Sequence, residues 1–175
     1  MSADQLRIAT LDRDAVEAYL ADLMHVSRAT WDPQTCTPWV EPWTADQFRY
    51  DLAGKFSMST YLADGDRAVG VCIAHERENG YGPHSDAPYG FIAKLALHPD
   101  YQGERAYVNS VRASGALFDA SIERIEGSGL SAVRLGVLEN NPTALRFYER
   151  RGFATIGTHR GTDGLSRIVM EREFA

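Results

Sequence analysis

Two polar segments of the chain combine residue types that could hold an anionic ligand and move a proton. The first, His98-Pro99-Asp100-Tyr101-Gln102-Gly103, follows an apolar run and precedes a long stretch with helical spacing. The second covers residues 141–153 and contains Tyr148. Unpaired N–H groups and a positive dipole end make a helix N-terminus suitable for a pyrophosphate. The second segment also holds carboxyl and phenol groups, which can donate or accept a proton.

Other kinds of catalytic site leave no pattern in this sequence. Neither a nucleophile elbow with a Ser/His/Asp set nor a Walker phosphate loop is present. The five histidines are scattered, and Cys36 and Cys72 have no CxxC spacing, so we expect no metal site and no disulfide framework. No spacing indicates a site built from two paired carboxylates.

The elements that must position these segments follow the order β-α-α-β-β-β-α-β-α-β-β. An alternating run predicts a strand at 6–11, and a helical pattern follows from about Asp14. The capping box Thr44-Ala45-Asp46-Gln47 predicts a helix that ends near Ala53. Strands are expected at 57–63, 67–75, 89–97, 131–138, 154–158 and 165–174, and helices at 104–126 and from Asn141-Pro142 to Arg151-Gly152.

Composition limits the class of protein and of partner. The chain has 175 residues, 44% apolar and 24% charged, which is typical of one folded domain over 1–175. Lys and Arg total 18 against 24 Asp and Glu, a net charge of −6. This balance argues against a nucleic-acid partner and suits a cationic one. Without a membrane-length apolar run or a signal peptide, we expect a cytoplasmic protein with no membrane partner.

The second half of the chain resembles the acetyl-CoA-binding core of the GNAT superfamily of N-acetyltransferases. The resemblance rests on the element order and on two motifs, Asn141-x-x-Ala-x-x-Phe-Tyr-Glu-x-x-Gly-Phe153 and Pro99-Asp100-Tyr101-Gln102. A shorter match, Pro42-Trp43-Thr44 followed by Phe48, is similar to the ribosomal-protein N-terminal alanine acetyltransferases. The resemblance implies an α/β (α+β) fold with a central mixed, mostly antiparallel sheet of about seven strands, flanked by about four helices.

The resemblance also implies acetyl-CoA as co-substrate and a set of residues that contact it. Backbone groups at Leu95, Ala96 and Leu97 would pair with the pantetheine arm like an added strand, and an N–H near Leu95 would polarise the acetyl carbonyl. Tyr148 would protonate the departing CoA thiolate. The other implied cofactor contacts are Gln102, Gly103, Glu104, Arg105, Ala106, Arg112 and Asn141.

Several of these residues also have a purely structural interpretation. Tyr148 could be a core aromatic residue, Asn141 only a helix cap, and Gly103 only a turn residue. Phe147 and Phe153 are assigned to the core.

The segment after Gln102 departs from the family pattern, which is Gln/Arg-x-x-Gly-x-Gly/Ala. Arg105 and Tyr107 stand where glycines are expected, and counting back from the next motif places those positions on Arg112 and Ser114. The segment is about seven residues longer than usual, close to two helical turns. Either the helix gains two turns or an insertion changes the loop, and Arg105 or Arg112 could then pair with phosphate directly.

The general base is missing from two positions where family members carry one, which are Phe91 and Gly136 here. The polar stretch 76–88 is a candidate substrate loop. The candidate bases are Glu76, His75, Asp86 and His84, acting directly or through water, although a deprotonated amine needs no strong base. The candidate acceptor contacts are Trp43, His75, His84 and Asp86, and each of the loop residues is also compatible with ordinary solvation.

We therefore expect an N-acetyltransferase that moves acetyl from acetyl-CoA to a primary amine of a small molecule or peptide, by direct attack in a ternary complex. Two alternatives stay open. One is a GNAT-like module that has lost catalysis and serves binding or assembly, and the other is a protein N-terminal acetyltransferase. Trp31, Trp39 and Trp43 are compatible with an acceptor cleft, with a homodimer contact or with ordinary packing.

Overall fold

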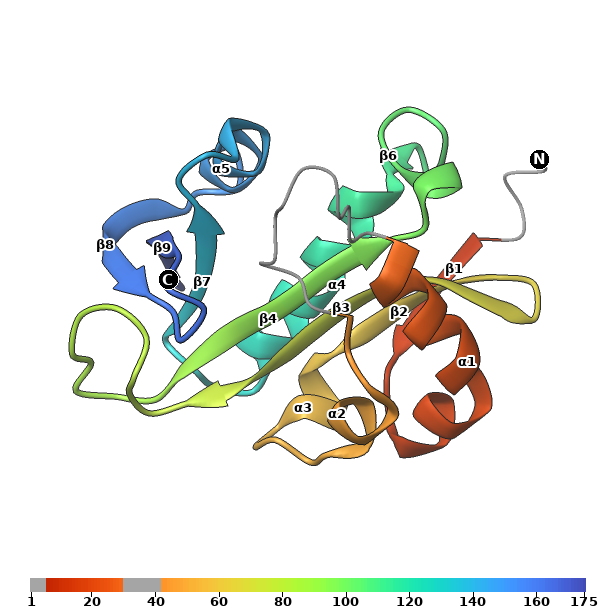
Figure 1. Ribbon diagram of the computed structural model, residues 1–175, viewed down its shortest axis with the longest axis horizontal. Helices are drawn as coiled ribbons and strands as arrows, with labels where there is room; N and C mark the ends of the chain where they lie inside the picture. Colours follow the sequence, from red (N-terminus) through yellow and green to blue (C-terminus); the bar gives the residue numbers. More distant parts are fainter. Residues whose placement is uncertain (1–5, 30–41) are drawn as a thin grey trace.

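The structure is a computed structural model that describes residues 6–29 and 42–175. Trp31, Cys36 and Trp39 lie outside these residues. The elements, shown in Figure 1, are β1 (Leu6–Thr10), α1 (Arg13–Ala29), α2 (Ala45–Arg49), α3 (Lys55–Met58), β2 (Thr60–Asp64), β3 (Arg67–Arg77), β4 (Tyr89–Leu97), the 3-10 helix η2 (Pro99–Tyr101), β5 (Tyr107–Val108), β6 (Val111–Arg112), α4 (Ala113–Gly127), β7 (Ala132–Leu138), α5 (Pro142–Glu149), β8 (Ala154–Arg160) and β9 (Ser166–Glu173).

The main sheet has seven strands in the order β1-β2-β3-β4-β7-β9-β8. Its neighbours are antiparallel except for β4 and β7, which run parallel. The expected mixed, mostly antiparallel sheet of about seven strands is confirmed. Within the described part of the chain, no helix is both long and apolar enough to cross a bilayer.

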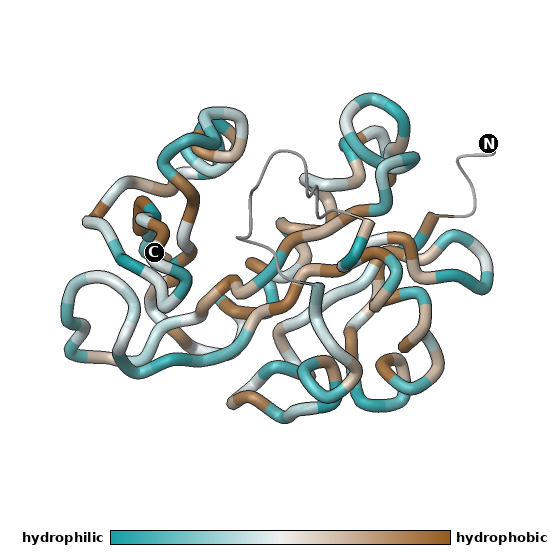
Figure 2. Tube along the Cα trace, viewed as in Figure 1, coloured by the Kyte–Doolittle hydropathy of each residue, from teal (hydrophilic) through white to brown (hydrophobic). Residues whose placement is uncertain are grey.

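Helices cover both faces of the sheet and bury a separate core on each. Leu117, Phe118 and Ile122 of α4 pack into one core, behind the sheet in Figure 1. On the opposite face, Val16 of α1 and Phe48 of α2 pack over β2 and β3. Figure 2 shows the apolar residues concentrated along the central strands, as burial on both faces requires.

The central feature of the sheet is the divergence of β4 and β7, visible in Figure 1. Their pairing covers only residues 90–92 against residues 133–135. On its other side, β4 has a bulge opposite β3, because Ile73 pairs with Lys94 and Ala74 with Ile92. Residues 93–97 of β4 and 136–138 of β7 therefore have no strand partner across the gap among the described residues.

Several local predictions are confirmed. The Thr44 hydroxyl accepts from the Gln47 N–H (3.3 Å), and the Gln47 side chain accepts from the Thr44 N–H (2.8 Å), which completes the capping box. The Asn141 side chain caps α5 by accepting from the Ala144 N–H at 3.0 Å. Gly152 follows α5 with φ +81°, a conformation that favours glycine after a helix.

The predicted helix over 104–126 is wrong in its first part. Residues 107–112 form the β5–β6 hairpin, and α4 begins only at Ala113. Asn109 and Ser110 both have positive φ (47° and 68°), as a tight two-residue hairpin turn requires. Each strand of the hairpin has two residues, too few to show an alternating pattern, whereas Val108 and Val111 fit helical spacing. The extra length is therefore an inserted loop before the helix.

The region after the capping box also differs from the prediction. The helix α2 ends at Arg49 instead of near Ala53, and β2 begins at Thr60 after the short helix α3. The cause is Lys55, whose buried ammonium donates to the carbonyls of Phe48 (2.8 Å) and Tyr50 at the end of α2. This cation holds the chain in a turn that propensity alone does not predict.

Candidate active site

The gap between β4 and β7 forms a cleft with a volume of about 520 Å³. The strand walls are residues 92–95 of β4 and 135–138 of β7. Because part of each wall is an unpaired strand edge, an extended ligand can pair with its backbone as an added strand does. The other lining residues are Trp43, Gln47, Ala144, Tyr148, Thr162, Asp163 and Arg167.

Tyr148 enters this cleft from α5 while its ring packs on the core. The ring centroids of Phe118 and Phe147 lie 5.4 and 5.1 Å from that of Tyr148, and that of Phe153 lies 5.9 Å away. Burial raises the pKa of the Tyr148 hydroxyl, and the Cys72 thiol adds to the increase. The hydroxyl therefore holds its proton at neutral pH. The structural and catalytic interpretations of Tyr148 are compatible, since its ring packs against the core and Tyr148 also lines the cleft.

The N-terminus of α4 is a candidate anion site, because the first N–H groups of a helix have no partner within it. Arg112 is its N-cap residue and makes no capping side-chain bond, and the Ala113 N–H donates to the Ala106 carbonyl at 3.0 Å. The N–H groups of residues 114–116 have no partner within a helix. A Cβ at Gly115 would lie 2.3 Å from an Arg151 guanidinium nitrogen, so the glycine lets this cation lie against the first turn.

The segment 102–106, predicted to contact phosphate, closes on itself before the hairpin. Gln102 donates from its side chain to the Leu97 carbonyl at 2.8 Å, and Arg105 donates to the Pro99 carbonyl at 3.1 Å. Glu104 forms an ion pair with Arg112. Gly103 has φ +65°, as a turn glycine does. The cofactor role of these residues stays a prediction, and the start of α4 lies beyond them.

The predicted base and loop residues do not line the cleft. His75 and Glu76 lie on β3 opposite Phe91 and Gly90, at the end where β4 and β7 are still paired. His75 is buried, its Nδ1 lies 2.9 Å from the Glu76 carbonyl, and burial lowers its pKa. His84 and Asp86 form an exposed pair at 3.4 Å in the loop between β3 and β4. Of the predicted acceptor contacts, Trp43 alone lines the cleft.

Tyr81 is a residue near the site that sequence analysis missed. A Cβ at Gly136, which lines the cleft, would lie 1.7 Å from the Tyr81 hydroxyl oxygen. The phenol thus occupies the space where family members carry a side chain on β7. Its ring stacks on His159 at 4.3 Å and contacts Phe91 at 4.6 Å. Arg134 fixes the loop by donating to the Tyr81 and Pro83 carbonyls at 3.3 and 2.7 Å.

Lys94 is the second residue that sequence analysis missed. It lines the cleft, yet it is only 5% exposed. It pairs with Ile73, so the two side chains share the sheet face covered by α1 and α2. Burial lowers the pKa of Lys94 to about 8, and no neighbouring charge opposes this effect. Among the described residues, no carboxylate or carbonyl accepts a hydrogen bond from its ammonium. A single lysine inside the apolar run 89–97 was the signal that could have found it.

The comparisons with known proteins agree with this geometry. The profile of the acetyltransferase (GNAT) family matches residues 22–153, most of the chain. The chain therefore belongs to this family, and it is an acetyltransferase by class. No curated protein sequence matches the chain.

Solved structures with a similar fold include two with bound CoA or a CoA-containing analogue and one that is named as an N-acetyltransferase. A chain of the NatC complex bound to Gag peptide and CoA is 17% identical, with 98% of this chain and 99% of that chain covered and a TM-score of 0.74. The ribosomal-protein-S18-alanine N-acetyltransferase from Escherichia coli is 19% identical (97% and 94% covered, TM-score 0.68). Naa50 of Arabidopsis thaliana with the bisubstrate analogue CoA-Ac-MVNAL is 16% identical (97% and 99%, TM-score 0.67). At these identities the likeness establishes the fold.

Substitution of methionine for each of the two buried lysines, Lys55 and Lys94, should change the free energy of unfolding differently. Lys55→Met removes a cation that satisfies backbone carbonyls and should lower the free energy of unfolding by about 2–4 kcal/mol. Lys94→Met removes a cation that has no partner among the described residues, so stability should stay unchanged or rise at neutral pH. Denaturant unfolding of both variants against wild type measures the difference. An equal loss in the two variants would contradict the assignment of Lys94 as unpartnered.

The pH dependence follows from the same pKa. Because the pKa of Lys94 falls from 10.5 in the unfolded chain to about 8 in the fold, the unfolded state holds the proton over this interval. Wild-type stability should therefore rise with pH from about 8 to about 10.5, and Lys94→Met should lack the Lys94 share of that rise. The rise in stability that remains in the variant includes the contribution of Lys55. Burial lowers the pKa of Lys55 to about 8 as well.

The contact between Tyr81 and Gly136 is testable by a double-mutant cycle. Gly136→Ala places a methyl group against the Tyr81 hydroxyl and should lower the free energy of unfolding by about 1–3 kcal/mol. In a Tyr81→Ala background the same substitution should cost little, since the phenol is gone. Gly157→Ala, whose Cβ would lie 3.3 Å from Pro83 of the same loop, is the matched mild change. Additive effects of the two substitutions would show that they do not touch.

Proposed function

We propose that the protein transfers the acetyl group of acetyl-CoA to a primary amine of a small molecule or peptide, by direct attack in a ternary complex. One observation carries the proposal: β4 and β7 diverge into a cleft with unpaired strand edges, and Tyr148, with its proton held, lines that cleft. The NatC structure with peptide and CoA and the Naa50 structure with a bisubstrate analogue support it through their shared fold.

The residues at the cleft suit the two parts of acetyl-CoA. Backbone groups at Leu95 and Leu97, on the unpaired edge of β4, offer partners to the pantetheine amides, although the Leu97 carbonyl already accepts from the Gln102 side chain. The backbone groups of Ala96, which pairs with Val71, point toward β3 instead. The N–H groups at residues 114–116, with Arg112 beside them, offer partners to the pyrophosphate. Asn141 remains a candidate contact at the start of α5, where its side chain already caps the helix. The inserted hairpin ends before α4 and so leaves this helix end in place, which supports cofactor binding over a module without catalysis.

The proposed reaction balances with one proton donor from the chain. The neutral amine nitrogen forms a bond to the acetyl carbon, and the carbon–sulfur bond breaks with its electron pair on sulfur. Tyr148 gives its hydroxyl proton to this sulfur. The amide nitrogen then releases a proton, which returns to Tyr148 through solvent. The Leu95 N–H is the candidate donor to the carbonyl oxygen while it carries negative charge.

The role of Tyr148 as proton donor has a direct test. Tyr148→Phe keeps the ring against Phe118 and removes only the hydroxyl, so kcat should fall on the order of 100-fold while the affinity for acetyl-CoA is kept. Thiol release measures kcat, and calorimetry measures affinity. Tyr19→Phe, which removes a hydroxyl on α1, is the matched control and should have wild-type activity. A Tyr148→Phe variant that turns over at the wild-type rate would remove Tyr148 from the mechanism.

The position of the pyrophosphate can be tested by adding negative charge at each candidate location. Ser114→Glu, in the first turn of α4, should weaken acetyl-CoA binding by about tenfold or more, because like charges repel where the helix dipole favours an anion. Arg105→Glu tests the earlier turn and should have the smaller effect. Calorimetry with S-acetylpantetheine, which lacks the phosphates, should show no change in either variant. A larger loss from Arg105→Glu would place the phosphates at residues 102–106.

A further inference from the structure

Lys94 sets the charge of the cleft. Among the residues that the structure describes, three charged side chains line it: Lys94, Arg167 and Asp163. Arg167 and Asp163 neutralise each other, since the guanidinium donates to both carboxylate oxygens at 3.0 and 2.6 Å. The ammonium of Lys94 is then the charge without a partner among the lining residues. A buried ion is costly unless a counter-charge satisfies it, so the cleft is complementary to an anionic group.

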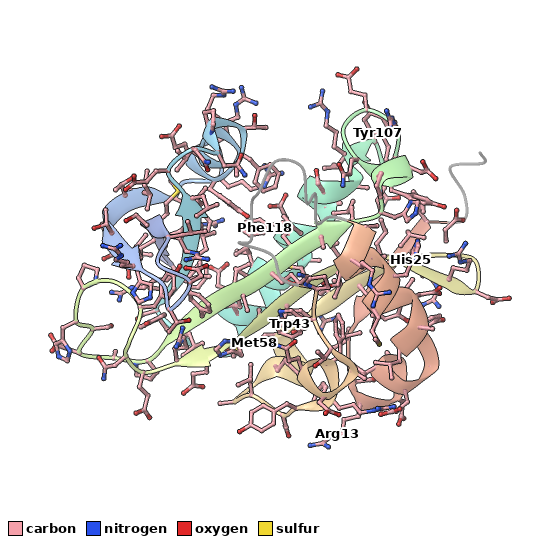
Figure 3. All side chains as sticks on the ribbon, in the orientation of Figure 1. Arg13, His25, Trp43, Met58, Tyr107 and Phe118 are labelled. Carbon is pink, nitrogen blue, oxygen red and sulfur yellow. The ribbon has the colours of Figure 1, made fainter. Side chains whose placement is uncertain are left out.

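The position of Lys94 indicates that the acceptor supplies this anionic group. Lys94 shares its sheet face with Ile73 and with the α1/α2 side, where Trp43 and Phe48 pack. Figure 3 shows Trp43 in front of the central strands. The N-terminal turn of α4, which suits the phosphates of acetyl-CoA, belongs to the helix that covers the opposite face. The two anion-binding features therefore serve two different ligands.

We infer that the acceptor is an amine that also carries a carboxylate, and that the Lys94 ammonium binds this carboxylate. This inference rests on the proposed acetyl transfer and names the acceptor class for it. It replaces the expectation of a cationic acceptor, which the net charge of −6 favoured. The overall charge is a property of the whole surface, whereas the acceptor meets only the cleft lining. Among the described lining residues, cations exceed carboxylates by two to one.

Two sources offer an amine and a carboxylate close together. One is a free amino acid, and the other is a peptide N-terminus followed by an acidic side chain. Trp43 and Gln47 come from one side of the cleft, and Thr162 comes from the β8–β9 loop on the other. Both sources can present an extended ligand between these sides, so the experiment must separate them.

The experiment compares matched acceptors on wild type, Lys94→Met and Thr162→Val, with CoA release as the readout. One pair is leucine and leucinamide, and the other is a peptide with aspartate or asparagine as its second residue. Wild type should favour the carboxylate member of at least one pair by about ten- to hundredfold in kcat/KM, as a charge-assisted hydrogen bond implies. The pair that shows the preference identifies the source.

Lys94→Met should abolish this preference, chiefly by raising KM for the carboxylate member, and should leave the neutral member nearly unchanged. Thr162→Val lines the same cleft without changing its charge and should retain the preference. If wild type acetylates the neutral members as well as or better than the carboxylates, the acceptor inference is wrong and the acetyltransferase function stands. An equal loss on both members in Lys94→Met would also overturn the inference. No CoA release with any amine would contradict both.

Discussion

The short parallel contact between β4 and β7 is the constraint on which the site depends. Three residues of each strand pair, and then the strands part. Each strand is held along most of its length by its other neighbour, β4 by β3 and β7 by β9, so the divergence does not weaken either half of the sheet. The junction itself is tight, because a Cβ at Gly90 would lie 2.3 Å from Ile125 of α4. The unpaired edges are polar groups inside a folded domain, and a ligand backbone can satisfy them.

The divergence also divides the cleft between two kinds of chemistry. The buried ion pair of Arg134 and Glu171 links β7, one wall of the cleft, to β9. Arg134 also donates to the carbonyl of Tyr81, whose side chain lies over Gly136. Tyr148 reaches the same cleft from α5, which begins directly after β7. The proton donor and the β7 wall thus depend on one another, whereas Lys94 belongs to β4 and to the opposite sheet face. In the roles that we propose, the acid belongs to the β7 half of the sheet and acceptor recognition to the β4 half.

Sequence alone predicted the features that local interactions determine. The Thr44 box, the Asn141 cap and the motif around Tyr148 involve contacts within a few residues, so their spacing is enough to place them. The hairpin at 107–112 was not predicted because its two-residue strands are too short to show alternating hydrophobicity. In addition, Asn109 and Ser110 adopt positive φ without the glycine that usually indicates such a turn. Tyr81 and Gly136 meet only through the tertiary fold. Residue type makes Glu76 a candidate base, yet the register of β3 places it opposite Gly90, away from the cleft.

The contrast between the two buried lysines argues for a ligand at Lys94. At Lys55 the fold surrounds a desolvated ammonium with the backbone carbonyls of Gln47, Phe48 and Tyr50, so hydrogen bonds within the chain offset part of the cost of burial. Burial still lowers its pKa to about 8. At Lys94 the described chain supplies no such acceptors, although an apolar side chain would fit a strand that is otherwise apolar. Residues that lower the stability of the folded protein are often retained because they serve its function. Lys94 fits this pattern, since its ammonium is desolvated and it lines the cleft. In our inference, the acceptor brings the counter-charge that Lys94 lacks among the described residues.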